Sequence, residues 1–169
     1  MDVNTMLLDL FSRVTEHVDT VVRGLDAAAL CASPEPGANS IGWLVWHLAR
    51  VQDHYVAGFL GEAQIWETGG WAGRFGLEPD PRNSGYGHSA TDAAAVRPDG
   101  PDALTGYYGA VVARTNAYLA GVTDDALGQI VDRSYDPPVT LAARLVSMAD
   151  DDLQHIGQAA YVRGLLQRR

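Results

Sequence analysis

The chain has 169 residues, of which 47% are hydrophobic and 20% are charged, a balance typical of one globular domain with a real hydrophobic core. We therefore expect a single domain over residues 1–169. The formal net charge is −9 and no basic stripe is present, so partners such as nucleic acid or an anionic membrane surface are not expected.

Cysteine content and hydropathy limit the compartment and the cofactor chemistry. The single cysteine, Cys31, excludes an intrachain disulfide and a zinc site built from cysteines. The N-terminal residues lack the basic segment and the continuous apolar run of a signal peptide. No run of about 18 apolar residues indicates a transmembrane helix. We therefore expect a cytoplasmic protein.

Two helices are expected in the first third of the chain. Apolar residues recur every three or four positions over residues 4–30, which predicts an amphipathic helix. Two prolines between residues 33 and 37 indicate a loop, and Asn39 or Ser40 can cap the next helix, expected over residues 41–60. The first half of that helix is apolar on nearly all sides, so we expect it at the centre of the domain.

The segment 62–101 breaks the helical pattern with many glycines and prolines. An irregular connection of this length inside a compact domain is often functional. Its aromatic residues are untypical of a disordered segment. We expect it to pack on the rest of the domain, with a short helical turn near residues 71–75, and leave open whether it covers a site.

Two further helices are expected over residues 102–120 and 140–166, and Thr140 can cap the second of them. A short turn at residues 123–127 and a loop at residues 133–138 separate them. No segment is typical of a strand. Four long helices with irregular connections predict an all-α fold, a four-helix bundle with a long irregular connection between its second and third helices.

Three residues on two of these helices have the chemistry of metal ligands. Asp151 and His155 are four residues apart, so both side chains lie on one face of the last helix, about one turn apart. His47 interrupts the apolar helix, and a buried histidine or carboxylate is costly without a partner. One divalent metal would satisfy all three. Two histidines and one carboxylate suit zinc with an open position, and also iron(II), nickel or manganese.

The same residues also have simpler interpretations. A lone histidine in an apolar helix, such as His47, is more often a satisfied core residue than a ligand. Asp151 and His155 also match the spacing of a surface ion pair, in which case the neighbouring Asp152 would be solvated. The residues alone do not decide between these simpler interpretations and a metal site.

Of four other polar residues, two bear on this site. His54 lies two turns from His47 on roughly the same face, so it either replaces His47 or contacts the ligand shell or substrate. Gln158 lies about one turn beyond His155 on the same side, and we expect it to donate a hydrogen bond to the ligand shell. His17 and His88 have no partner visible in the sequence and are interpreted as surface or loop residues.

Two segments resemble the signature regions of a known family. They are residues 40–48, Ser-Ile-Gly-Trp-Leu-Val-Trp-His-Leu, and residues 151–158, Asp-Asp-Leu-Gln-His-Ile-Gly-Gln. Both are similar to the DinB-like metalloprotein superfamily, which includes the N-terminal domain of mycothiol-dependent maleylpyruvate isomerase. The resemblance covers nearly the whole chain in helix order, including residues 69–71, and implies a DinB-like four-helix bundle.

The resemblance also implies a ligand set. Members of the family hold a divalent metal with one histidine of the second helix and an H-x-x-x-H pair of the last helix. These positions correspond to His47, Asp151 and His155. Asp151 departs from the histidine of most members, and the isomerase branch likewise has a carboxylate there.

The activity implied by the resemblance is that of a thiol S-transferase or an isomerase-like enzyme with mycothiol or bacillithiol as co-substrate. The metal, first of all Zn²⁺, with Ni²⁺, Fe²⁺ or Mn²⁺ as alternatives, would bind the thiol and lower its pKa, and the thiolate would attack an electrophilic small molecule. That chemistry needs no protein nucleophile, so Cys31 is expected to be inert. The alternative is a non-catalytic metal- or small-ligand-binding bundle of the stress-response type. Family members commonly pair, which implies a homodimer.

Overall fold

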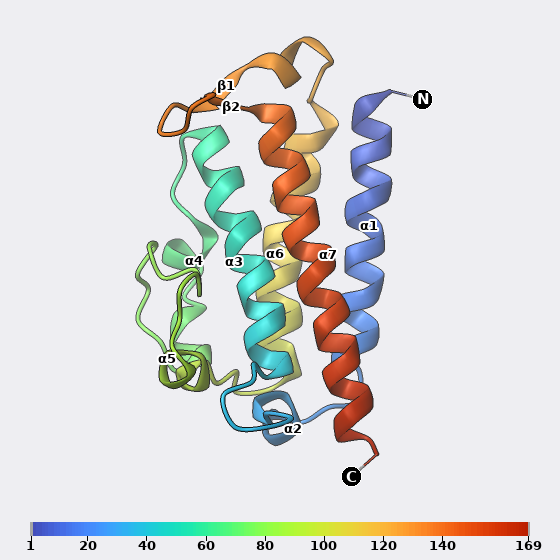
Figure 1. Ribbon diagram of the computed structural model, residues 1–169, viewed down its shortest axis with the longest axis vertical. Helices are drawn as coiled ribbons and strands as arrows, with labels where there is room; N and C mark the ends of the chain where they lie inside the picture. The colour runs from blue at the N-terminus through green and yellow to red at the C-terminus, as the bar shows by residue number, and fades with distance from the viewer. Residues whose placement is uncertain (1, 169) are drawn as a thin grey trace.

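The computed structural model describes residues 2–168, which fold into a bundle of four long helices (Figure 1). These helices are α1 (Val3–Val22), α3 (Ile41–Leu60), α6 (Pro101–Ala120) and α7 (Leu141–Leu166). The all-α four-helix bundle predicted from the sequence is confirmed. Residues 1 and 169, the two ends of the predicted domain, lie outside the described range.

Each long helix packs against two others. α3 contacts α6 and α7, and α1 contacts the same two helices from the opposite corner of the bundle. Figure 1 shows that α3 and α6 run in the same direction, so the chain between them returns along the outside of α3. This connection contains α4 (Ile65–Thr68), the 3-10 helix η1 (Ala72–Phe75) and α5 (Ala90–Ala95). η1 is the short helical turn predicted near residues 71–75.

The starts of the two site-bearing helices follow from their capping residues. The Ser40 hydroxyl accepts a hydrogen bond from the Trp43 backbone N–H at the start of α3. Thr140 does the same for the Ala143 N–H at the start of α7. Every residue from 41 to 50 is buried, so the central position predicted for this helix is confirmed.

Two predictions of secondary structure are wrong. The helix predicted over residues 4–30 is two helices, because α1 ends at Val22 and α2 (Ala27–Cys31) begins after a turn. Gly24 in that turn has a φ of +76°, which L-residues with a side chain rarely adopt. Periodicity could not reveal the break, because the apolar spacing continues across it.

The second error concerns two strands in the connection between α6 and α7, where the short turn predicted at residues 123–127 is present. It contains the 3-10 helix η2 (Asp125–Gly128) and two short antiparallel strands, β1 (Ile130–Asp132) and β2 (Val139–Thr140). Strands of two and three residues carry too little alternation to be recognised in a sequence. Among the described residues, no helix combines the length and hydrophobicity that crossing a membrane requires.

Candidate metal centre and its cavity

His47 of α3 and Asp151 and His155 of α7 meet between the two helices, and we refer to them as the candidate metal centre. Asp151 Oδ1 lies 3.8 Å from His47 Nε2 and 3.6 Å from His155 Nε2. One donor atom from each residue lies within 4.8 Å of the other two, which is close enough for one metal ion to contact all three. The structure therefore brings together the three residues that the sequence singled out.

Hydrogen bonds on the far side of each imidazole fix its tautomer. His47 Nδ1 lies 2.5 Å from the Ser84 carbonyl oxygen, which can only accept, so Nδ1 carries the proton. His155 Nδ1 donates in the same way to Gln158 Oε1 at 3.1 Å, so Gln158 accepts a hydrogen bond where the sequence predicted a donor. In both rings Nε2 is the nitrogen that faces Asp151. This is the arrangement in which metal-bound histidines are held in proteins.

The negative charge of the Asp151 carboxylate is not fully compensated by hydrogen bonds within the protein. Its Oδ2 atom is buried and has no hydrogen-bond partner. Burial alone raises the pKa of Asp151, but the two neighbouring imidazoles lower it to about 2. The carboxylate is therefore ionised at neutral pH. A buried anionic oxygen without a partner is unfavourable, and a divalent cation among these donors would satisfy it.

Trp43 packs the two imidazoles in place. Its ring stacks on His47 with centroids 4.7 Å apart, and its edge contacts His155 at 5.9 Å. Trp43 Nε1 donates to His88 Nδ1 at 3.1 Å, so the proton of His88 is on Nε2, which donates to Asn83 Oδ1 at 2.9 Å. His88 lies in a loop as predicted, with partners that the sequence did not show, and His17 is exposed on α1 as predicted.

A glycine permits the close approach of the 83–88 loop to this centre. A Cβ atom on Gly85 would lie 2.7 Å from His47 Nδ1 and 2.9 Å from the Trp46 ring. Gly85 also has a φ of +95°, a backbone conformation that favours glycine. The absence of a side chain here lets the Ser84 carbonyl reach His47.

Arg50, one turn beyond His47 on α3, anchors the same segment. Its side chain is fully buried and donates to the carbonyl oxygens of Pro81 and Asn83, both at 3.0 Å. The guanidinium also lies over the Trp66 ring at 4.9 Å. Arg50 was not among the predicted site residues, although an arginine in a helix that is apolar on nearly all sides is a signal of a buried polar role.

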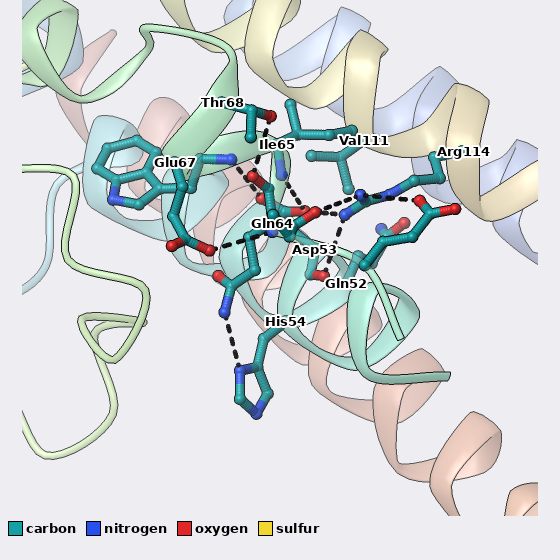
Figure 2. A network of polar contacts seen from close by, with 12 residues as sticks. Gln52, Asp53, His54, Gln64, Ile65, Glu67, Thr68, Val111 and Arg114 are labelled. Atoms are coloured by element: carbon teal, nitrogen blue, oxygen red, sulfur yellow. Dashed lines mark hydrogen bonds and ion pairs between the residues drawn. The ribbon is translucent and has the colours of Figure 1, made fainter. Parts of the chain in front are cut away.

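Asp53 completes this anchor from the next turn of α3 (Figure 2). It accepts hydrogen bonds from the backbone N–H groups of Ile65 and Trp66, at 2.9 and 2.8 Å, and so holds the start of α4. It also pairs with Arg50 and with Arg114 of α6. The connection between α3 and α6 is thus tied to α3 by buried charges.

His54 does not take the place of His47. It is exposed, and its Nδ1 lies 3.3 Å from Gln64 Nε2. Figure 2 shows the two side chains pointing toward each other. Burial of part of the ring, followed by the charges of Arg50 and Arg144, lowers the pKa of His54. The residue is thus neutral at pH 7 and stands outside the group of three donors.

Asp152 is not solvated, contrary to the surface interpretation of its segment. It is fully buried, and its Oδ2 accepts a hydrogen bond from Gln52 Nε2 at 2.8 Å. Gln52 in turn accepts from the Thr115 hydroxyl at 3.2 Å. The α7 residues next to the candidate metal centre are therefore held from inside the bundle.

The candidate metal centre opens into a cavity of about 610 Å³, which we refer to as the first cavity. Its lining combines polar groups with apolar surface and includes His47, Asp151, His54, Tyr55, Val51, Tyr135 and Ser147. Arg82, Ser84 and Tyr86 also line it, and all three come from the segment 62–101. That segment therefore forms one wall of the first cavity. The sequence had left open whether this segment covers a site.

Comparison with known proteins gives two findings. A family model described as mycothiol-S-transferase matches residues 6–168. The crystal structure of a conserved protein from Enterococcus faecalis is similar to this chain with a TM-score of 0.91 and 30% sequence identity, over 100% of this chain and 99% of that one. No curated protein matches.

Proposed function

Because the chain belongs to the mycothiol S-transferase family, we propose that it transfers a low-molecular-weight thiol of the mycothiol type to an electrophilic small molecule, with a divalent metal held by His47, Asp151 and His155. One observation carries the proposal above all. The Nε2 atoms of two imidazoles and an ionised carboxylate face one place, and that place opens into a cavity.

The donor set fits such a metal. Two nitrogens and one carboxylate leave a coordination position open in a tetrahedral site, and the buried Asp151 Oδ2 has no partner within the protein. We propose zinc, and nickel, iron(II) or manganese have the same preference for this donor set. A closed structural site would need a fourth protein ligand. His54 is turned to Gln64 instead, which favours a reactive site over a structural one.

The metal, when bound, would supply the Lewis acidity that keeps a thiol as thiolate at neutral pH. The residues of this chain have three other tasks. Ser84 and Gln158 hold the two imidazoles in the required tautomer. Trp43 shields them from water on one side, and the first cavity holds the organic parts of the substrates. In the reaction the thiolate sulfur forms a bond to an electrophilic carbon, and the displaced electron pair leaves with a leaving group or takes up a proton.

Cys31 has no part in this scheme. Its thiol faces the Pro98 carbonyl oxygen at 3.9 Å, away from the first cavity. Burial raises the pKa of Cys31, so the thiol is less nucleophilic than an exposed one. The protein would thus contribute a site for two substrates and no covalent intermediate.

Cytoplasmic location and a homodimer belong to the same proposal. A reduced low-molecular-weight thiol is available in the reducing cytoplasm. Val146, Leu153 and Tyr161 are large apolar residues on α7 that are 67%, 43% and 67% exposed, and a second copy could cover them. Light scattering of the purified protein checks the dimer.

The test of the function is a thiol-transfer assay on protein of known metal content. The protein as isolated is assayed with mycothiol and a chromogenic aryl halide, then after chelation, and again after zinc is restored. We expect activity that is lost with the metal and returns with it. Transfer at the same rate in the chelated protein would refute the role of the metal, and failure to transfer mycothiol, bacillithiol or cysteine would refute the activity.

A further inference from the structure

His54 and Tyr55 lie side by side on α3, and both line the first cavity where it meets a second hollow beside the β1–β2 hairpin. Their rings meet edge to face with centroids 5.2 Å apart. His54 is seven residues beyond His47, close to two full turns, so the two imidazoles lie on nearly the same face of α3. Neither residue is among the three donors of the candidate metal centre.

The Gln64 side chain fixes the tautomer of His54. Gln64 Nε2 lies 3.2 Å from the Pro81 carbonyl oxygen, which can only accept, so the amide nitrogen belongs on this side. The same nitrogen lies 3.3 Å from His54 Nδ1, and since an amide nitrogen only donates, Nδ1 accepts. The proton of the neutral ring is therefore on Nε2, and Figure 2 shows this nitrogen turned away from Gln64. Burial and the charges of Arg50 and Arg144 lower the pKa of His54, which keeps the ring neutral at pH 7.

Arg144 of α7 fixes the Tyr55 hydroxyl in a similar way. Arg144 Nη1 donates to that hydroxyl at 3.1 Å, and the guanidinium lies over the Tyr55 ring at 4.7 Å. Asp132 holds the arginine in place, because its Oδ2 accepts from Arg144 Nη2 at 2.6 Å. A guanidinium cannot accept a hydrogen bond. The Tyr55 hydroxyl therefore accepts from Arg144 and keeps its own hydrogen for another acceptor.

Two donors thus remain unused beside one cavity. Within residues 2–168, His54 Nε2 forms no hydrogen bond, and the Tyr55 hydroxyl bonds only to Arg144. Each donor belongs to a side chain whose other polar contact is made by a fixed partner. Preorganised donors of this kind, from histidine and tyrosine side chains, form oxyanion sites in enzymes.

The donor pair lies too far from the candidate metal centre to contact a sulfur atom there. At the rise of an α-helix, His54 is about 10 Å and Tyr55 about 12 Å along the axis from His47. All side chains of a helix lean toward its N-terminus, so the rings keep an offset of similar size. An acceptor for the pair must therefore belong to the electrophile, several bonds beyond the carbon that the thiolate attacks.

An oxygen in that position gains negative charge during the attack only if it is conjugated with the attacked carbon. A carbonyl oxygen on an activated double bond and a nitro oxygen on an aromatic ring both meet this condition. Donors aimed at developing charge stabilise the transition state more than the ground state, so they raise the rate as well as the affinity.

We propose that His54 Nε2–H and the Tyr55 hydroxyl bind a conjugated carbonyl or nitro oxygen of the electrophile. With an enone, the thiolate sulfur bonds to the β-carbon, and the π electron pair moves onto the oxygen that the two donors hold. The proton that the thiol released to water then returns to the α-carbon, which restores the carbonyl, and no group leaves. The inference rests on the proposed function for the reaction, but the donors can be tested without one.

The first experiment is NMR of zinc-loaded protein with ¹⁵N-labelled histidine, in the absence of any thiol. At pH 7 we expect His54 to be neutral with its proton on Nε2, and His54→Phe identifies its signals. Cyclohexanone has the acceptor oxygen without a conjugated carbon, and it should shift the Nε2 signal saturably, whereas the exposed His17 should not respond. Tyr55→Phe should weaken this binding at least about threefold. A proton on Nδ1, no saturable response, or unchanged binding in Tyr55→Phe would overturn the proposal.

The second experiment compares 2-cyclohexen-1-one with benzyl bromide, which has no oxygen, at a fixed thiol. We expect His54→Phe and Tyr55→Phe each to lower kcat/KM for the enone about tenfold or more and to change that for benzyl bromide less than about twofold. His54→Gln, whose amide can donate, should recover part of the enone rate. His17→Phe is the matched control and should leave both rates unchanged, because His17 lies on α1 away from the first cavity.

The electrophiles separate this proposal from the proposed function. Equal losses for both electrophiles in variants that thermal unfolding shows to be folded, or no loss for either, would overturn the role of the donor pair. If neither electrophile reacts with the wild-type protein while cyclohexanone binds as expected, the donor pair is supported and the proposed function fails.

Discussion

Replacing Gly85 with alanine tests whether the 83–88 loop holds His47. The new Cβ would lie 2.7 Å from His47 Nδ1 and 2.9 Å from Trp46, both well inside van der Waals contact. The loop must then move away, and the hydrogen bond from His47 to the Ser84 carbonyl is lost or lengthened. Gly87 is the matched control, because it also has a positive φ, +74°, but nothing lies within 4 Å of a Cβ placed there.

The two substitutions have the same expected cost in folding free energy and differ in their expected effect on metal affinity. A side chain in the left-handed region costs about 1–2 kcal/mol of folding free energy, and both variants have this cost. Only the alanine at Gly85 also disturbs the partner of a candidate ligand, and loss of such a partner lowers metal affinity by about 10- to 100-fold. This corresponds to about 1.4–2.8 kcal/mol of binding free energy.

The assay is a competition for Zn²⁺ between the protein and a chromophoric chelator, with urea unfolding of both variants alongside. We expect Gly87→Ala to bind zinc with wild-type affinity and Gly85→Ala to bind it about 10- to 100-fold more weakly. Equal zinc affinities in the two variants would refute the reasoning, even if both are destabilised.

Three other substitutions probe the remaining parts of the site. Asp151→Asn keeps the volume and removes the charge, so zinc affinity should fall by more than about tenfold in the same competition assay; an unchanged affinity would contradict the ligand assignment. Asp53→Asn leaves the buried guanidinium of Arg50 and the partly buried one of Arg114 without their carboxylate, and should cost about 3–5 kcal/mol of stability in urea, whereas a loss below about 1 kcal/mol would contradict the anchor. Cys31→Ser should leave thiol transfer unchanged, and loss of transfer would show that a protein nucleophile had been overlooked.

The helices and their starts could be predicted because they depend on local patterns. The apolar spacing of α3 and α7 and the caps Ser40 and Thr140 are readable in the sequence and stand in the structure as predicted. The convergence of His47 on the α7 pair was predictable for a similar reason. Each polar residue interrupted an apolar face, and packing α3 against α7 brought them together.

The hydrogen bonds that hold the residues of the candidate metal centre could not be predicted, because they depend on the path of an irregular segment. The Ser84 carbonyl carries no side-chain signal, and His88 meets Trp43 only after the chain has returned along α3. The buried Asp152 was equally hidden, since burial depends on which side of α7 faces Gln52. The role of Arg50 could have been predicted, because a fully buried arginine needs hydrogen-bond acceptors.

The metal content of the purified wild-type protein and of two single variants tests the proposed site most directly. His47→Ala and His155→Ala each remove one proposed ligand, and His17→Ala is the control because His17 is exposed on α1. The ligand assignment predicts about one equivalent of transition metal in the wild type and in His17→Ala. It predicts none in the other two variants, with helical circular dichroism retained in all. Full metal stoichiometry in His47→Ala or in His155→Ala would contradict the assignment.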